Sequence, residues 1–373
     1  MRVGNTGAFG MKFRPIAIMA LVFAVLAGCS KRDEERAVPR DAYLFAPVRT
    51  AAACIAVLEK PDAKRVLLLG EDALKARGVF EALGMECLAK PSLKADIAFV
   101  SCSGMSGKSR EKVLSRISDN GVLAWLMDVR GVSASDFRAM LESFGSQAAH
   151  LWMPGENRWL LVGRKVPRTI KLSAIFERFS SEGTLSVMDE KRLGGIPELF
   201  SGYAGTVSEV MPAFESGDLA AEVKPEFFLT REIPAIDWIS AEKIDNDVKE
   251  KTFADIRSMQ VVRRLAVEGG MLAVGGEEEK ALSCWNRALM RNSRELFVRE
   301  RIDRLERNAK GFLEVKKVLQ AMKCYETIIK IDPGDMGALH NFGVCMRKIG
   351  REDIAKTILD RVEEMQKTGR RPE

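Results

Sequence analysis

The chain has 373 residues, with 58 Lys and Arg against 52 Asp and Glu and a formal net charge of +6. This small excess gives no support for a nucleic-acid-binding protein, which usually carries a strongly basic surface. Hydrophobic residues make up 46% of the chain, so a sizeable core can form, and the length predicts two or more domains.

The N-terminus has the pattern of an export signal. Lys12 and Arg14 precede an apolar run at residues 16–26, and small residues lead to Cys29. The run is shorter than the roughly 20 residues that usually span a bilayer, although a plain signal or an anchor helix is the alternative. Leu-Ala-Gly before Cys29 resembles the bacterial lipobox, which implies removal of residues 1–28 and a diacylglycerol on Cys29. Loss of three cations would leave a charge of about +3.

The residues after Cys29 predict a tether and a location. The polar, mixed-charge stretch at 29–47 is expected to link the lipid to the folded part. By analogy with lipoprotein sorting, Ser30 in place of an aspartate favours the outer membrane over the inner membrane of the cell envelope. The remaining cysteines lack the close spacing of metal sites, so we expect buried thiols and no metal, with a disulfide between the last two as the alternative. They are Cys54, Cys87, Cys102, Cys284, Cys324 and Cys345.

Residues 48–165 alternate between helical and strand patterns. Such alternation predicts an α/β domain with a mainly parallel sheet that is covered on both faces. A Pro-Gly-Glu-Asn turn at 154–157 predicts a closing antiparallel hairpin. The expected helices lie at 51–58, 73–83, 109–117 and 135–144, and the expected strands at 66–69, 86–89, 96–101, 122–129, 150–153 and 159–163.

Several stretches resemble spermidine synthase-like proteins, which have a methyltransferase-type Rossmann fold. The resemblance rests on KPDAKRVLLLG at 60–70, DNGVLAWLMDVRGVSASDFRAMLESF from 119, AHLWMPGENRWLLVGRK at 149–165 and KPEFFLTREIPAIDW at 224–238. It covers roughly residues 48–235. It implies a cofactor turn after the first strand, at Gly70, Glu71 and Asp72.

The chain departs from this family at the positions that carry its chemistry. The family has a glycine cluster where this chain has Gly70, Glu71 and Asp72, and the two side chains would obstruct a cofactor. The family's acid after the second strand and its catalytic aspartate after the third are missing, with Ser101 and Cys102 standing at the latter place. The short span at 91–95 leaves no room for one strand–helix unit. We therefore expect a remnant turn, no catalytic residue and no cofactor.

Two other sets of residues are candidates for phosphate binding or catalysis. The segment CSGMSGKS at 102–109 follows a strand as a phosphate-binding loop does, but Cys102 replaces the first required glycine. An ordinary strand–helix connection is expected there. The two histidines, His150 and His340, have no neighbouring pattern of nucleophile and acid.

Residues 166–257 predict a connector that packs on the sheet domain, and a repeat follows at 258–369. Its units are expected at about 262–295, 302–335 and 336–369, with the six-residue excess of the first spacing near 295–301. Small residues recur where paired helices would cross, at offsets of 40 and 34 residues. The pattern resembles the tetratricopeptide signature, carried by Leu265, Gly269, Ala281, Trp285, Ala288, Leu305, Ala309, Ala321, Tyr325, Pro333, Leu339, Gly343 and Ala355.

These features together predict a lipid-anchored envelope scaffold. Tetratricopeptide repeats lack chemistry of their own and bind other proteins, so the expected partners are a protein and, through the anchor, a membrane. One alternative is an aminopropyltransferase of the spermidine synthase class with residual activity. The other is a protein that binds a nucleoside or polyamine without catalysis, through Glu71, Asp72 and Asp128.

Overall fold

The computed structural model describes residues 40–368 except 89–92, 103–106, 145–148, 165, 167–168, 191–192, 215–221, 224–233 and 243. Ala46–Glu373 form one compact unit, separate from Met1–Phe45. The predicted signal peptide and Cys29 lie outside the described residues. The helix α2 (Arg40–Leu58) begins inside the segment expected as a tether.

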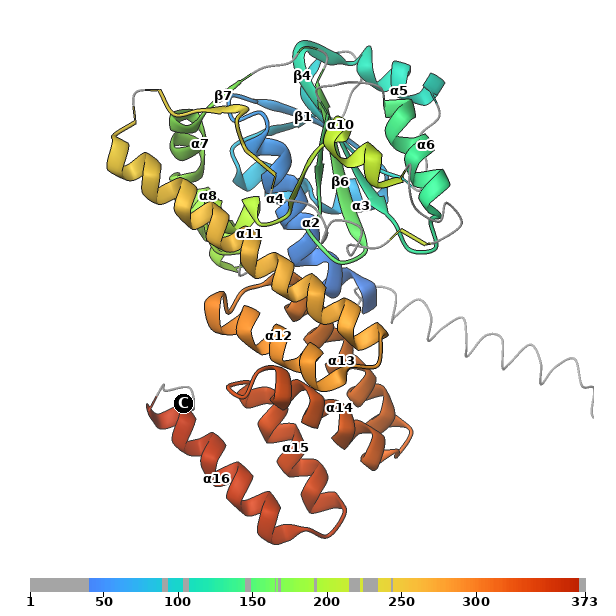
Figure 1. Cartoon of the computed structure of the whole chain (residues 1–373), viewed down its shortest axis with the longest axis vertical. Helices are drawn as coiled ribbons and strands as arrows, with labels where there is room; N and C mark the ends of the chain where they lie inside the picture. Colours follow the sequence, from blue (N-terminus) through green and yellow to red (C-terminus); the bar gives the residue numbers. More distant parts are fainter. Residues whose placement is uncertain are drawn as a thin grey trace, which may run out of the picture. The chain divides into compact units, whose positions relative to one another are not determined.

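A mostly parallel sheet of seven strands forms the first part of the compact unit (Figure 1). The strand order is β2-β1-β3-β4-β6-β5-β8, with parallel pairing from β2 to β4 and antiparallel pairing from β4 to β8. The carboxyl ends of β1, β3 and β4 therefore meet at one edge. The strands are β1 (Arg65–Leu69), β2 (Glu86–Leu88), β3 (Ala95–Ser101), β4 (Ile117–Asp128), β5 (Ala149–Trp152), β6 (Arg158–Arg164) and β8 (Tyr203–Thr206).

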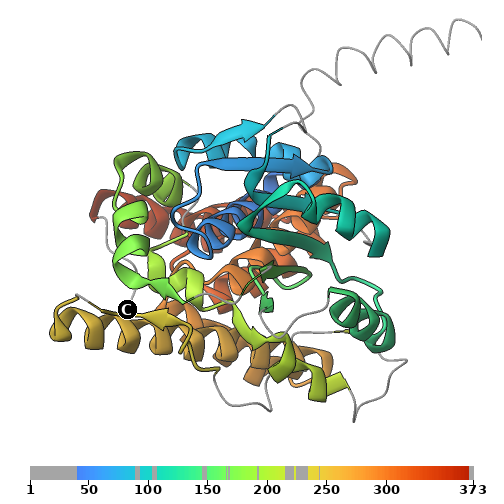
Figure 2. The ribbon, with the colours of Figure 1, turned by 90° about the horizontal axis from the view of Figure 1, so that it is seen from above.

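Helices cover both faces of this sheet, as the sequence predicted (Figure 2). Along β1, Val66 and Leu68 face one apolar cluster and Leu67 the other, which is the alternation of a sheet buried on both sides. Each residue at 48–60 is buried, so α2 is a core helix. With α2 lie α3 (Glu71–Lys75), α4 (Arg77–Ala82), α7 (Leu172–Phe179), α8 (Glu182–Glu190) and α9 (Ile196–Phe200); the opposite face carries α5 (Gly107–Leu114), α6 (Ala134–Phe144), α10 (Val207–Val210) and a 3-10 turn (Met211–Phe214).

Three expected elements differ from the observed ones. The helix predicted at 73–83 is broken at Ala76 into α3 and α4. β4 begins at Ile117, the residue at which a helix was predicted to end. Ile117 instead pairs with Ala95 of β3, next to an irregularity in the register. The glycine-rich stretch at 202–205 contains β8, which pairs with β5 and so makes the predicted connector part of the sheet.

The second part of the compact unit is all-helical. Three helical hairpins follow one another, and each is joined by a three-residue turn. The six extra residues of the first repeat spacing lie in α13, which has 19 residues against 13 in α15. The hairpins are α11 (Asn246–Val274) with α12 (Glu278–Arg291), α13 (Leu296–Glu314) with α14 (Val318–Ile331), and α15 (Met336–Lys348) with α16 (Glu352–Thr368).

Candidate functional site

The turn after β1 is closed by the neighbouring strand. Gly70 has a φ of +96°, a conformation that residues with a side chain rarely adopt. A Cβ atom at Gly70 would lie 1.9 Å from the carbonyl oxygen of Ser101, at the end of β3. The amide of Ala73 donates a 3.0 Å hydrogen bond to the Ser101 hydroxyl. The glycine thus makes room for β3, and a serine of that strand caps the first turn of α3.

An arginine bridges the two acids at this edge of the sheet. Arg158, at the start of β6, lies 3.0 Å from Asp72 after β1 and 3.4 Å from Asp128 at the end of β4. Burial raises the pKa of Asp128, but hydrogen bonds from Arg130 and the charge of Arg158 outweigh it and lower the pKa. The convergence of Asp72 and Asp128 that a polyamine site would require is therefore observed, with an arginine of the same chain between them.

Glu71 takes no part in this bridge. Its carboxylate lies 2.5 Å from the Lys75 ammonium, one helical turn further along α3. The hydrogen bond from Lys75 lowers the pKa of Glu71, which is fully exposed. Of the three acids proposed for a polyamine site, two meet at Arg158 and the third forms a surface pair.

A second charged cluster lies inside the sheet region, where no pattern in the sequence predicted it. Glu59 directly follows α2 and is buried, with its carboxylate 2.7 Å from His150 Nδ1 and accepting a 2.8 Å hydrogen bond from Trp152 Nε1. The Arg164 guanidinium is paired with the same carboxylate. Burial opposes ionisation of Glu59, but His150 and Arg164 outweigh it and lower its pKa.

The rings around Glu59 give the cluster an apolar shell. The Trp238 ring lies 4.5 Å from His150 and 6.1 Å from Trp152 between ring centroids, and Tyr203 packs on the same group. Because Glu59 is held by three donors, this geometry indicates a fixed structural network. In this network His150 pairs with Glu59 and packs against Trp238.

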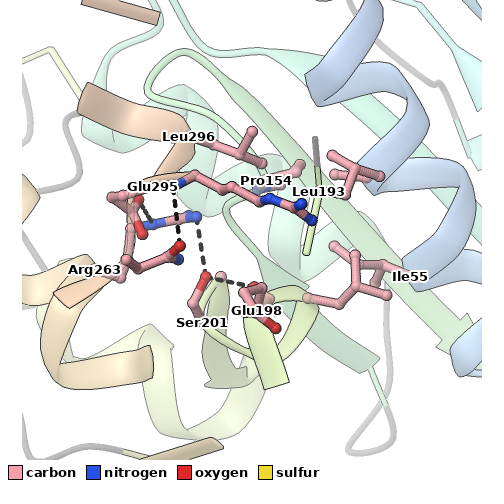
Figure 3. Close-up of a pocket in the computed structure, with 13 residues that line it drawn as sticks. Ile55, Pro154, Leu193, Glu198, Ser201, Arg263, Glu295 and Leu296 are labelled. Carbon is pink, nitrogen blue, oxygen red and sulfur yellow. Dashed lines mark hydrogen bonds and ion pairs between the residues drawn. The ribbon is translucent and has the colours of Figure 1, made fainter. Parts of the chain in front are cut away.

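Arg263 of α11 joins the helical hairpins to the sheet region (Figure 3). Its guanidinium donates to the carbonyl of Met153 at 2.5 Å and to the Ser201 hydroxyl at 3.0 Å, and it is paired with Glu295. The cavity around it has a volume of about 10 Å³, close to the space one water needs. This junction is filled by the chain's own side chains, so it is a structural joint.

The β5–β6 turn docks on α13. The amide of Glu156 donates a 2.8 Å hydrogen bond to Glu300, and the Glu156 carboxylate lies 3.0 Å from Arg304. A Cβ at Gly155 would come within 3.0 Å of both Glu300 and Val48, which explains the glycine of this turn. The sequence predicted the turn but not its role in holding α13.

The helical hairpins repeat the same turn geometry at the predicted offsets. Gly276, Lys316 and Gly350 end the first helix of each hairpin with positive φ values of 80°, 59° and 80°. Lys316 is the one residue other than glycine with a positive φ in the described part of the chain. The amide of the residue that follows each of them donates to a carbonyl five residues earlier in the chain, at 2.8, 2.8 and 3.0 Å. This is the bond that closes a Schellman-type helix end.

The signature residues lie where the hairpins cross. Ala281, Ala321 and Ala355 are fully buried, each at an equivalent place in the second helix. A Cβ at Gly269 would lie 2.5 Å from the Trp285 ring, and one at Gly343 would lie 3.1 Å from Leu359. Buried as well are Leu265, Ala288, Ala309, Tyr325 and Leu339, whereas Leu305 is partly buried and Pro333 is exposed.

The phosphate-like loop and the cysteines are the remaining candidates from the sequence. Residues 103–106 of the loop lie outside the described residues, and Ser109 is exposed in the first turn of α5. The six cysteines in the described part of the chain are free thiols. Cys54, Cys284 and Cys345 are buried as expected, but Cys87, Cys102 and Cys324 are only half-buried. Within the described ranges, no group of three or more His, Cys, Asp or Glu side chains could hold a metal ion. No described helix is both long and apolar enough to cross a membrane.

No family model, curated protein or solved structure matches the chain.

Proposed function

We propose that this chain is a lipid-anchored scaffold of the cell envelope that binds another protein through tetratricopeptide repeats, and that its sheet region is a catalytically inactive relative of spermidine synthase. The observation that carries the proposal is the repeated helix end at Gly276, Lys316 and Gly350, because identical hydrogen bonds recur there at offsets of 40 and 34 residues. A stack of repeated helical hairpins is the architecture that solenoid proteins use to present an extended binding surface.

The second and third hairpins supply the partner surface in this proposal. The sheet region engages the first hairpin, through Arg263 and the contact of α9 with α11, and also the first half of α13, through Glu300 and Arg304. Further along α13 and in α15, by contrast, Lys310 and His340 are exposed to solvent. Partner binding on these helices requires no rearrangement of the junction.

The closed carboxyl edge supports the absence of catalysis. A transferase of this class needs a carboxylate after the third strand to accept a proton from the attacking amine, and Ser101 and Cys102 stand there instead. Ser101 is engaged with the turn at Gly70, so this position holds the fold together.

One observation favours polyamine binding as a second function. Asp72 and Asp128 converge as a cation site would require, although Arg158 lies between them. A polyamine would have to displace this arginine.

Photo-crosslinking in intact cells tests the scaffold. A crosslinking amino acid at Lys310 or His340 is expected to capture one discrete protein, whereas the same group at exposed Lys112 of α5 captures none. Capture from Lys112 alone would place the partner on the sheet region and overturn the assignment to the repeats. Labelling with a radioactive fatty acid, compared with a Cys29→Ala variant, tests the anchor separately.

A further inference from the structure

A groove lies between residues 234–241 and the first half of α11. Its volume is about 440 Å³, within the range of small-molecule sites in proteins. Apolar side chains supply most of its lining, including Ile236 from the loop and Phe253 and Ile256 from the helix. The groove is therefore large enough and apolar enough to take the body of an organic ligand.

Both walls of the groove are fixed by the rest of the fold. β9 (Ile239–Ser240) pairs with β7 (Ile170–Lys171), and the amide of Ile170 donates a 3.0 Å hydrogen bond to the carbonyl of Trp238. The Trp238 ring is held in the aromatic shell around Glu59. On the other side, α11 is held by the junction at Arg263. A site formed in advance avoids the cost of ordering its walls when a ligand binds.

The charges along the groove are unbalanced in favour of cations. Lys249, Phe253 and Arg257 follow one another at intervals of four residues and so share a face of α11. Their spacing places the two cations about 12 Å apart along the helix, one on each side of the aromatic ring. Within the described residues, neither cation forms an ion pair, and Asp237 is the acid among the lining residues.

A buried amide adds a polar contact to the same lining. Gln260 is 6% exposed, and its Nε2 atom has no hydrogen-bond partner in the structure. A buried donor without a partner costs free energy, and a ligand oxygen could satisfy it after a small movement of the side chain.

We propose that this groove binds an elongated apolar carboxylate of the medium-chain acyl type. Its apolar body lies on Ile236, Phe253 and Ile256, and its carboxylate pairs with Lys249 or Arg257. The groove shares no lining residue with the proposed repeat surface or with the turn at Gly70. A test of the groove is therefore separate from a test of the proposed scaffold function.

Isothermal titration tests the site on residues 30–373, which contain the whole compact unit. Hexanoate, octanoate and decanoate, each below its micelle concentration, are expected to bind about three- to fourfold more tightly per added methylene. Decanol of the same length is expected to bind more weakly than decanoate, and added salt should reduce the difference. Equal binding of the alcohol and the acid, or no dependence on length, would overturn the proposal.

Substitutions on α11 locate the site. Lys249→Ala and Arg257→Ala should each weaken decanoate binding about two- to fivefold, while Lys251→Ala, an exposed lysine that does not line the groove, should leave it unchanged. Phe253→Ala should weaken binding further, with retained helicity as the check on folding. An equal effect of Lys251→Ala would reveal binding elsewhere. Groove-dependent binding of an acidic peptide with none of decanoate would assign the groove to a protein segment and reject the acyl ligand.

Discussion

The carboxyl edge of the sheet and the turns of the helical hairpins both depend on left-handed backbone, but for different purposes. At the sheet edge this conformation occurs once, at Gly70, where any side chain would collide with Ser101. In the hairpins the conformation recurs three times, and a Cβ at Gly276 or Gly350 would meet nothing within 4 Å. Gly70 lets β3 pack directly against the turn, whereas the repeated turns have open space around their glycines. The contrast shows that a positive φ alone does not reveal why a glycine is needed. The atoms that face the residue distinguish a close approach of two strands from a simple helix end.

The largest effect is expected at Glu59, in the buried charged network of the sheet region. Glu59→Gln leaves the buried charge of Arg164 without its counter-ion, which should lower the free energy of unfolding by about 3–5 kcal/mol. Chemical denaturation measures this. Glu71→Gln, at a fully exposed acid of α3, serves as the control and should change little.

A smaller effect is expected at the sheet-edge glycine. Gly70→Ala adds both backbone strain and a collision with Ser101, so a loss of about 2–4 kcal/mol is expected. Gly78→Ala in α4 faces open space and should be neutral or stabilise by about 0.5–1 kcal/mol. Similar stabilities for the two variants would show that the edge can relax and that the turn is not closed by packing.

The junction between the two regions should respond to pH through Glu300. Burial raises the pKa of Glu300 from its ordinary value of 4.5 to about 7. The folded state therefore holds the proton more tightly than the unfolded state. The protonated Glu300 carboxyl therefore adds to the free energy of unfolding in full below about pH 4.5, and this contribution is lost as the pH rises through 7.

Denaturation at a series of pH values checks this expectation. The Glu300→Gln variant should lose less stability between pH 5 and 8, roughly the pH range in which the buried carboxyl gives up its proton. Glu314→Gln, at an exposed position of the same helix, should keep the slope of the original protein. A slope that is identical in all three proteins would contradict the burial of the Glu300 carboxyl.

The smallest effect is expected at the repeated turns. Lys316→Gly places glycine where the other hairpins already have it, and relief of the left-handed strain should stabilise the fold by about 0.5–1 kcal/mol. Gly276→Ala makes the opposite change and should cost about 1 kcal/mol. Thermal unfolding of the two variants measures both. A destabilised Lys316→Gly would show that the lysine side chain makes a contribution of its own.

Patterns within single elements were sufficient to predict most of the architecture. The covered sheet follows from apolar strands between amphipathic helices, and the closing hairpin follows from the turn at 154–157. The offsets of 40 and 34 residues predicted helix pairs in this region, because each pair must bury the same small residues at its crossing. The structure has three helical hairpins there, although α11 begins at Asn246 and α13 at Leu296, before the expected units.

The features that the sequence did not predict depend on contacts between distant segments. β8 is a four-residue strand that contains one glycine, and its pairing with β5 is what makes it a strand. In the sequence, Glu59 has the pattern of an ordinary polar helix end. Its buried network forms only because the fold brings His150 and Arg164 against it from more than 90 residues away. Arg158 between Asp72 and Asp128 is equally invisible in the sequence, because three different elements supply the charges.

The central claim about the sheet edge is that its turn does not bind a cofactor, and titration with S-adenosylmethionine tests this claim most directly. The chain of residues 30–373 is expected to give no binding heat, with Arg158→Ala and the original protein alike in this respect. Saturable binding by the original protein that is lost in Asp72→Asn would contradict the account, since it would show that the turn at Gly70 still opens to a nucleoside.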